Sequence, residues 1–334
     1  MSNHRCDPKW KLKTILTLGP ASSDEGTITS MLEVADKFRL NTSHLDVNSL
    51  YTWLKKLDAI FTKLQKQIPV VIDLQGSKMR IGEFSPVTNI PEKVTLFNGK
   101  FSESKQDIPV PHKILFSVVK PGDILFLNDA KIILKITKVI GDKIEADTLV
   151  NGPLSSNKGI NRKEHPVPFN GLSNKDLSII EVANKYSFTE FAFSFTHDGY
   201  EADFIRKYIN NKLLIAKIER VEAVDNIYSI DSKFDEIWFC RGDLGAQAGI
   251  FNLGKLQEKF VSEITDLKNR CFLAGQVLEH MTHFSEPTRS EIVHLYDTEK
   301  NGFEGIVLSD ETAIGENINS IVKFFENYSE STDL

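Results

Sequence analysis

Residues 213–245, LLIAKIERVEAVDNIYSIDSKFDEIWFCRGDLG, contain the pattern that decides the fold. An apolar run at 213–218 is followed by a segment of helical period at 221–228, and a second apolar run follows at 236–240. Short strands that alternate with helices are typical of βα units in a parallel sheet. Polar residues stand at the end of both apolar runs, in KIER and RGD. In barrel folds the catalytic residues lie at the carboxyl ends of the strands.

The same alternation recurs along the whole chain. Strands are predicted at 14–20, 38–44, 70–76, 188–195, 213–218, 236–240, 271–275 and 305–308. Helices are predicted after them at 27–35, 48–65, 176–185, 200–209, 221–228, 253–269, 290–301 and 320–327. Eight βα units predict a (β/α)8 TIM barrel, and 334 residues suffice for a barrel of roughly 250 residues plus an insertion.

The segment between the third strand and the third helix has a different sequence pattern, in which strands and turns alternate without helices. It contains the strand-like runs KVTLF, DILFLN, KIILKITKVI and KIEADTLV, separated by turn signals such as Pro121-Gly122 and Gly141-Asp142. We interpret it as a small β-barrel, which should act as a lid because loops after barrel strands open on the catalytic face. We therefore predict a barrel domain at 1–82 and 166–334 and an inserted β-rich lid domain at 83–165.

Composition and charge argue against several classes of protein. The chain has 41% hydrophobic and 26% charged residues and no apolar run near the roughly 18 residues that a membrane span needs. The opening MSNHRCDPKW lacks the apolar segment of a secretory signal, so we expect a cytoplasmic protein without a membrane partner. The net charge of −6, without a basic stripe, argues against nucleic acid. Cys6, Cys240 and Cys271 have no disulfide or metal-ligand spacing, which predicts reduced thiols.

The best chemical signal is the pair Lys217 and Glu219, which lie two residues apart on one strand and therefore point to the same side. Asp243 supplies a second carboxylate after the next strand, and two carboxylates with substrate oxygens are a usual way to hold Mg²⁺ or Mn²⁺. The alternative is a structural layer of salt bridges at the barrel mouth. Gly242 and Gly245 lie in a turn that opens a helix, whose free amides would hold a carboxylate or phosphate.

Other polar residues at strand ends are less specific. Arg39 and Arg80 each have the forked guanidinium that suits phosphate, and an ion pair at the surface is the alternative for each. His44 is either a site residue or part of the core or a loop. The RGD triplet at 241–243 follows a predicted barrel strand, which argues against an integrin-type adhesion role.

At these residues the sequence resembles the pyruvate kinase family, over both the barrel and the lid. In the barrel, ILTLGPASS (15–23), FRLNTSH (38–44), IDLQGSKMR (72–80) and AKIER (216–220) resemble the family's TxGPAS, FRLNxSH, LDLQGPKIR and SKIEN. RGDLG (241–245) is unchanged, and LAGQVLEHM (273–281), PTRSEI (287–292) and LSDETAIGE (308–316) resemble CATQMLESM, PTRAEV and LSGETAxG. In the lid, GDILFLNDAKI (122–132) and SSNKGIN (155–161) resemble GDxIxxDDGxI and SxKGVN.

The resemblance implies a phosphotransferase that moves the phosphoryl group of phosphoenolpyruvate to ADP, giving pyruvate and ATP, with Mg²⁺ or Mn²⁺. By this resemblance Lys217 would stabilise the enolate oxygen of pyruvate and Arg39 would bind the transferring phosphoryl group. Glu219 and Asp243 match the metal ligands, and the amides of Gly242 and Asp243 match the site of the substrate carboxylate.

Further positions match ligand sites of the family. The resemblance assigns Asn41, Ser43, Asp73 and the backbone of Leu74 to a monovalent-cation site, and His44, Arg80 and Lys158 to the nucleotide phosphates. Lys78 stands where K⁺-dependent members carry Glu, so we expect its ammonium to replace K⁺ and activity without K⁺. The motifs end before the family's C-terminal regulatory domain, so we expect a short form without sugar-phosphate activation, which would form any homodimer through the barrel.

The sequence also departs from the family's pattern. Gly275, at the substrate site, replaces a Thr linked to protonation of enolpyruvate, and Asp310 replaces a Gly and with Ser309 is a candidate proton relay. Ser77 replaces a Pro, and Arg220 replaces an Asn. Two alternatives therefore stay open: a metal-dependent lyase that acts on oxaloacetate or a related keto acid, and a pseudoenzyme that only binds ligands.

Overall fold

Eight parallel strands close into a barrel in the computed structural model of the chain, which describes residues 12–76, 79–128, 131–162 and 171–330. The barrel strands are β1 (Lys13–Leu18), β2 (Lys37–Asn41), β3 (Val70–Leu74), β12 (Thr189–Phe193), β13 (Leu214–Ile218), β14 (Glu236–Cys240), β15 (Arg270–Ala274) and β16 (Gly305–Leu308). Each pairs with the barrel strands before and after it in the sequence, and β1 closes the ring against β16. The predicted TIM barrel and its eight strands are confirmed.

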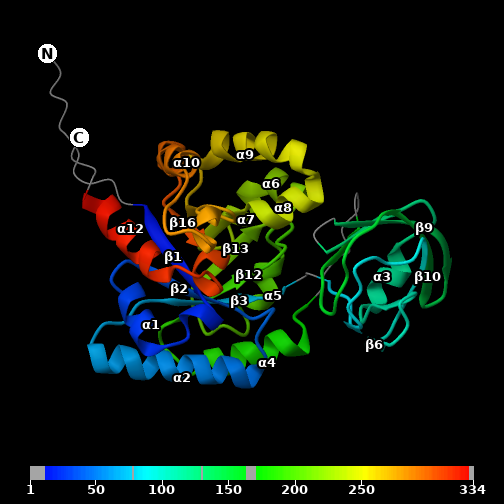
Figure 1. Ribbon diagram of the computed structural model, residues 1–334, viewed down its shortest axis with the longest axis horizontal. Helices are drawn as coiled ribbons and strands as arrows, with labels where there is room; N and C mark the ends of the chain where they lie inside the picture. The colour runs from blue at the N-terminus through cyan, green and yellow to red at the C-terminus, as the bar shows by residue number, and fades with distance from the viewer. Residues whose placement is uncertain (1–11, 77–78, 129–130, 163–170, 331–334) are drawn as a thin grey trace, which may run out of the picture.

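Helices surround the barrel (Figure 1). They are α1 (Glu25–Met31), α2 (Val47–Leu64), α4 (Asn174–Ala183), α5 (Glu201–Ile205), α6 (Val221–Asp225), α7 (Ile227–Asp231), α8 (Arg241–Ala248), α9 (Ile250–Ile264), α10 (Arg289–Lys300), α11 (Asp310–Ala313) and α12 (Ile318–Glu330), with 3₁₀ turns η1 (Pro20–Ser22) and η2 (Glu279–Thr282). Local sequence sets their ends. The side chain of Asp46 caps α2 by accepting the N–H of Ser49 at 2.7 Å, and α2 ends at Gln65, whose φ is 51°.

Two helices differ from their predictions. The helix predicted at 200–209 is shortened to α5, and left-handed backbone at Asn210 and Asn211 turns the chain toward the next strand. The helix predicted at 221–228 is divided into α6 and α7 at Asn226, whose φ and ψ are −99° and 18°. Asparagine tolerates both the left-handed backbone at 210–211 and the irregular backbone at 226 better than most residues do.

Apolar side chains form two layers, one inside the barrel and one between its strands and helices. The inner layer consists of Ile15, Val71, Ala192, Ile215, Trp238, Cys240, Phe272, Ala274 and Val307. Neighbouring residues belong to different layers because successive side chains of a strand point to opposite faces. On β14, for example, Ile237 packs in the outer layer and Trp238 in the inner one.

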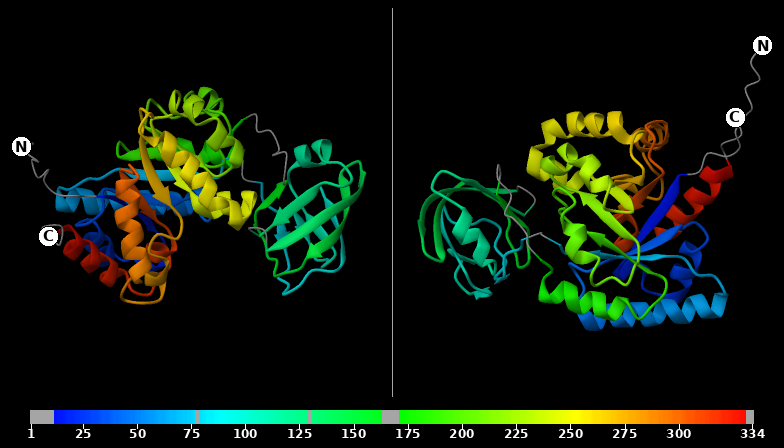
Figure 2. Two further views of the ribbon diagram at one scale, coloured as in Figure 1. Left: turned by 90° about the horizontal axis from the view of Figure 1, so that it is seen from above. Right: turned by 180° about the vertical axis from the view of Figure 1, so that it is seen from behind.

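The chain between β3 and α4 forms a second, β-rich unit, which we call the lid (residues 79–162; Figure 2). It contains β4 (Glu83–Phe84), β5 (Lys93–Phe97), β6 (Phe101–Ser102), β7 (Asp107–Pro109), α3 (Lys113–Val118), β8 (Ile124–Leu127), β9 (Ile132–Ile140), β10 (Lys143–Val150) and β11 (Ile160–Arg162). Six strands form one sheet in the order β11-β8-β9-β10-β5-β7, and β4 pairs with β6. The lid has a hydrophobic core of its own. The exact boundaries between the barrel domain and the lid domain stay a prediction.

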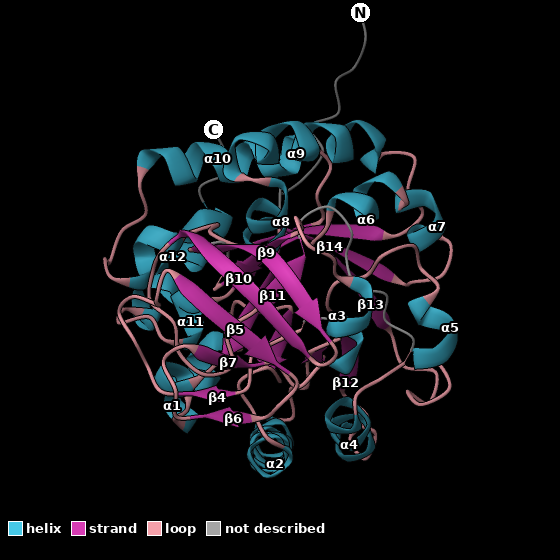
Figure 3. Cartoon of the chain, turned by 90° about the vertical axis from the view of Figure 1, so that its right-hand side faces the viewer, coloured by secondary structure: helices cyan, strands magenta, loops and turns pink. Residues whose placement is uncertain are grey.

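The lid lies beyond one end of the barrel (Figure 1), and a view from the lid side shows its sheet in front of the ring of barrel helices (Figure 3). Arg80 of the lid forms an isolated β-bridge with Gly159 and also lines a cavity at the barrel mouth, so the lid borders that cavity. Within the described part of the chain, no helix combines the length and apolarity required to cross a membrane.

Candidate active site

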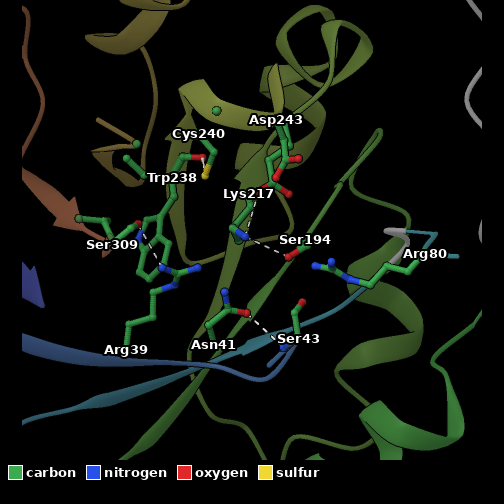
Figure 4. Close-up of a pocket in the computed structure, with 15 residues that line it drawn as sticks. Arg39, Asn41, Ser43, Arg80, Ser194, Lys217, Trp238, Cys240, Asp243 and Ser309 are labelled. Carbon is green, nitrogen blue, oxygen red and sulfur yellow. Dashed lines mark hydrogen bonds and ion pairs between the residues drawn. The ribbon is translucent and has the colours of Figure 1, made fainter. Parts of the chain in front are cut away.

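The carboxyl ends of the barrel strands surround a cavity of about 160 Å³, the substrate cavity (Figure 4). The predicted site residues that line it are Arg39, Asn41, Ser43, Arg80, Lys217, Glu219, Gly242, Asp243, Gly275 and Ser309. Sequence reasoning assigned no role to the other lining residues, which are Ser194, Trp238, Cys240, Ala274 and Val307. The alternation of side chains along a strand could identify Trp238 and Cys240 as inward-facing residues. No neighbouring motif indicates that they line a functional site.

Two cations and two carboxylates meet at this mouth. Asp73 Oδ2 lies 2.6 Å from Arg39 Nη2 and 3.1 Å from Lys217 Nζ, and Lys217 Nζ lies 2.9 Å from Glu219 Oε1. Burial alone would raise the pKa of Asp73, yet Lys217 and Arg39 hold that pKa below its usual range. Burial opposes the charge of Lys217, but Asp73 and Glu219 raise its pKa above the ordinary value. The ammonium of Lys217 therefore stays protonated at neutral pH.

Glu219 is held through both of its oxygens. Oε1 pairs with Lys217, as their spacing on one strand predicts, and Oε2 accepts the N–H of Phe195 at 2.8 Å. Phe195 has a φ of 60°, so this amide is presented by a left-handed residue just after β12. Asp243, in the first turn of α8, lines the same cavity. The two predicted metal ligands thus face one space from neighbouring strand ends.

Ser194, which sequence reasoning left without a role, joins two strands beside Lys217. Its hydroxyl accepts a hydrogen bond from Lys217 Nζ at 3.0 Å and donates to the carbonyl of Leu74 at 2.9 Å. A second residue that the sequence did not reveal is the cation Lys175 of α4, which donates to the carbonyl of Thr42 at 2.6 Å. Ser194 could have been identified as a polar residue at the end of a strand. Lys175 could not, because it lies in a helix far along the sequence from Thr42.

The residues assigned to a monovalent-cation site lie together at the ends of β2 and β3. Asn41 Oδ1 accepts the N–H of Ser43 at 3.1 Å, and both residues line the substrate cavity. Asp73 and Leu74 end β3, where Asp73 is occupied by Arg39 and Lys217. Lys78, together with Ser77 and Cys6, lies outside the described residues, so K⁺-independent activity stays a prediction.

A larger cavity of about 900 Å³, the outer cavity, adjoins the first and shares Arg39, Asn41 and Ser309 with it. It runs along α2 and the loops after β1, β2 and β16, and its lining includes His44, Asp310, Trp53 and Lys56. Lys56 Nζ lies 5.4 Å from the centroid of the Trp53 ring. Asp310 therefore faces a different cavity from Gly275, although Ser309 lies between the two.

Positive charge gathers around His44. Burial lowers the pKa of His44, and Arg80, Arg39 and Lys158 lower it further, which keeps the imidazole neutral at pH 7. Lys158 lines neither cavity, and its carbonyl accepts the N–H of Ile81 at 2.9 Å within the lid. Arg80 and Lys158 thus act electrostatically on His44, but only His44 and Arg80 border the space a ligand would fill.

Gly275 has a backbone conformation that suits only glycine well. Its φ is 90°, and a Cβ atom there would lie 3.2 Å from the amide nitrogen of Gly242. A threonine at this position would be strained and would press on the turn that begins α8. Glycine in place of the family's Thr therefore fits the left-handed backbone at this position. The replacement changes the backbone requirement as well as removing a hydroxyl group.

Known proteins match the chain over nearly its whole length. The family model of the pyruvate kinase barrel domain matches residues 9–321. A pyruvate kinase of Thermococcus litoralis is 30% identical over 97% of this chain and 71% of its own length, and one of Aeropyrum pernix is 32% identical over 91% and 67%. The chain spans about two thirds of the length of such relatives. The crystal structure of pyruvate kinase from Pyrobaculum aerophilum has the same fold, with a TM-score of 0.82 at 24% identity, over 96% of this chain and 73% of that one. The chain belongs to the pyruvate kinase family.

Proposed function

We propose that the chain transfers the phosphoryl group of phosphoenolpyruvate to ADP, giving pyruvate and ATP, with the help of Mg²⁺. The observation that carries this proposal is the position of Arg39, which lines both the substrate cavity and the outer cavity. A group that passes from one substrate to the other must cross this shared wall. A guanidinium, with its fork of N–H donors, suits the oxygens of a phosphoryl group.

The chain's own residues account for the charges of the reaction. The protonated ammonium of Lys217 stabilises the negative charge that develops on the enolate oxygen of pyruvate. The amides of Gly242 and Asp243, in the first turn of α8, receive the substrate carboxylate. Ser194 and Asp73 fix the ammonium of Lys217, so little reorganisation is required when the charge appears.

Glu219 and Asp243 fit a divalent metal ion by their chemistry. Both are carboxylates, the oxygen donors that Mg²⁺ and Mn²⁺ prefer, and both line the substrate cavity. No third His, Cys, Asp or Glu completes a metal-binding group among the described residues, so substrate oxygens would supply the remaining ligands. When bound there, Mg²⁺ would neutralise the negative charge of the phosphoryl group. The contribution of Lys217 and the Phe195 amide is to hold Glu219 in place.

The outer cavity is the place for the nucleoside of ADP. Its volume of about 900 Å³ exceeds the 160 Å³ of the substrate cavity, and the ring of Trp53 gives it an aromatic wall. His44 on its lining and the charges of Arg80 and Lys158 nearby favour the nucleotide phosphates. A cytoplasmic location and a homodimer formed through the barrel complete the proposal.

An assay for pyruvate with phosphoenolpyruvate, ADP and Mg²⁺ tests the proposal. We expect turnover that requires all three components. Decarboxylation of oxaloacetate without ADP would instead identify a lyase, and binding of phosphoenolpyruvate without turnover would identify a pseudoenzyme.

Replacement of the metal ligands tests the site itself. Glu219→Gln and Asp243→Asn should each abolish detectable Mn²⁺ binding, measured by electron paramagnetic resonance, and lower turnover by at least about 10²-fold. The exposed residue Glu258 provides the control, since Glu258→Gln should change neither quantity. Retained Mn²⁺ binding in both site variants would place the metal elsewhere.

A further inference from the structure

A single arginine side chain ties together three elements behind the proposed carboxylate site. Arg241, the first residue of α8, donates through Nε and Nη2 to the carbonyl of Gly275, at 2.9 and 2.6 Å. Nη2 also donates to the carbonyl of Gln276 at 2.7 Å. Nη1 lies 2.6 Å from Nε2 of His294 on α10. The guanidinium thus connects the start of α8, the turn after β15 and the face of α10.

The turn that Arg241 holds has an unusual backbone. Gly275 and Gln276 are consecutive left-handed residues, with φ values of 90° and 53°. For Gln276 this conformation is unfavourable and persists only where the surroundings enforce it. Two adjacent carbonyls that accept hydrogen bonds from one rigid guanidinium provide such a restraint, because the planar fork fixes their relative direction.

This turn lies directly against the proposed carboxylate site. The absent Cβ of Gly275 would sit 3.2 Å from the amide nitrogen of Gly242 and 3.6 Å from that of Arg241. A small shift of the turn would therefore displace the first residues of α8, of which Gly242 and Asp243 line the substrate cavity. The position of the turn and the position of the carboxylate site are mechanically coupled.

His294 holds the other end of the guanidinium. Arginine can only donate, so Nε2 of His294 must be the unprotonated nitrogen of a neutral imidazole. Burial and the charge of Arg241 both lower the pKa of His294, in agreement with this tautomer. Among the residues that the structure describes, no ion pair joins Arg241 to a carboxylate, although the charge of Glu311 acts on it, and its own charge adds to the positive end of α8.

We propose that Arg241, held by His294, is a positioning residue that fixes the Gly275–Gln276 turn against the Gly242 amide and so sets the affinity for the substrate carboxylate. The proposal rests on the proposed function, because it takes phosphoenolpyruvate as the ligand at α8. It predicts a selective effect: the substrate cavity should lose affinity, whereas the outer cavity, on the other side of Arg39, should not.

Tryptophan fluorescence can report the two cavities separately, because Trp238 lines one and Trp53 the other. In a Trp10→Phe/Trp53→Phe background, Arg241→Met should raise the Kd for phosphoenolpyruvate by roughly tenfold or more. Arg241→Lys, which keeps the charge but cannot span both carbonyls, should be intermediate. In a Trp10→Phe/Trp238→Phe background, the same substitutions should leave the Kd for ADP within about twofold.

His294 offers a second, milder test. His294→Leu should weaken phosphoenolpyruvate binding, and His294→Asn, whose amide oxygen can still accept from Arg241, should recover much of the affinity. The matched control is Arg206→Met, because Arg206 also donates through Nε and Nη2 to one carbonyl, that of Lys233, but on the outside of the barrel. This control should leave both affinities unchanged.

Hydrogen exchange measured by mass spectrometry tests the restraint without any ligand. Peptides covering residues 273–281 should exchange faster in Arg241→Met than in the parent protein. Equal losses of phosphoenolpyruvate and ADP affinity, or unchanged exchange with unchanged phosphoenolpyruvate affinity, would overturn the proposal. Failure of the parent protein to bind phosphoenolpyruvate would overturn the proposed function as well, which separates that outcome from failure of the positioning role alone.

Discussion

The barrel contains two clusters of charge at opposite ends, one buried and one partly buried, and each places one lysine between two carboxylates. The base cluster consists of Lys37, Glu190 and Glu236, and the mouth cluster of Lys217, Asp73 and Glu219. The distances from Nζ to the carboxylate oxygens are 2.8 Å twice at the base, and 2.9 and 3.1 Å at the mouth. In the ion pairs alone, the two clusters are nearly indistinguishable.

Their surroundings differ. At the base, Trp238 Nε1 donates to Glu236 Oε1 at 2.9 Å, and neither cavity of the mouth reaches the cluster. At the mouth, Arg39 adds a second cation and the cluster opens on the substrate cavity. A structural layer of salt bridges therefore does exist in this barrel, but at the other end. A cavity beside the charges, more than the charges themselves, distinguishes a candidate site from a structural cluster.

The largest effect should come from Lys217→Met. It removes the cation that we assign to the enolate oxygen, so kcat should fall by roughly 10³-fold. Asp73 retains its pairing with Arg39, and Glu219 retains the Phe195 amide, so the loss of stability should be smaller than that of the corresponding base variant. Steady-state kinetics and urea unfolding measure the two quantities. Unchanged kcat would show that the mouth cluster is structural as well.

Lys37→Met should have the opposite profile. It leaves the buried Glu236 and the partly buried Glu190 without their cation, which should lower the free energy of unfolding by about 3 kcal/mol. The Kd for phosphoenolpyruvate, read from Trp238, should stay close to that of the parent protein. A triple variant that also carries Glu190→Gln and Glu236→Gln should recover part of the stability. No recovery would mean that packing of the lysine chain, and not charge, is responsible.

Gly275→Ala should have a moderate effect. Its φ of 90° is unfavourable for alanine, so we expect a loss of about 1 to 2 kcal/mol in the free energy of unfolding. The new methyl group also presses on the Gly242 amide, so phosphoenolpyruvate binding should weaken. Gly171, which has open space for a Cβ, provides the control as Gly171→Ala. Unfolding in urea and the Trp238 titration check both parts, and equal stability of the two variants would contradict the argument from strain.

The smallest effect should be in the pH dependence of stability. Lys217 and Arg39 hold the pKa of Asp73 below its ordinary value of 3.8. The contribution of Asp73 to the free energy of unfolding is therefore present above pH 3.8 and is lost as the pH falls through the folded pKa. Burial raises the pKa of Glu190 above its ordinary value of 4.5, so stability should fall as the pH rises from 4.5 through the folded pKa.

Unfolding curves from pH 3 to pH 7 measure these slopes. Asp73→Asn should flatten the acid limb, whereas Glu190→Gln should remove the decline at higher pH. Identical slopes for the parent protein and both variants would show that the two carboxylates titrate alike in the folded and unfolded states.

The sequence predicted the parts of the molecule that local pattern controls. The barrel strands follow from apolar runs, and Lys217, Glu219 and Asp243 were identified because they lie at strand ends. The base cluster was not predicted, since Lys37 and Glu190 lie 153 positions apart and meet only through the register of the closed barrel. For the same reason, the sequence did not reveal that Arg241 would reach a turn on another strand.

The separate cores of the lid and the barrel have a consequence for the order of folding during synthesis. The core of the lid lies between Met79 and Ile160, so all of its contacts are available once that stretch has left the ribosome. The barrel cannot close until β16 is made, because Lys13 of β1 pairs with Gly305. Local contacts form faster than distant ones. The lid should therefore be a folded body on a nascent chain while β3 still lacks β12 and β1 still lacks β16, so one edge of each of these two strands stays unpaired during that period.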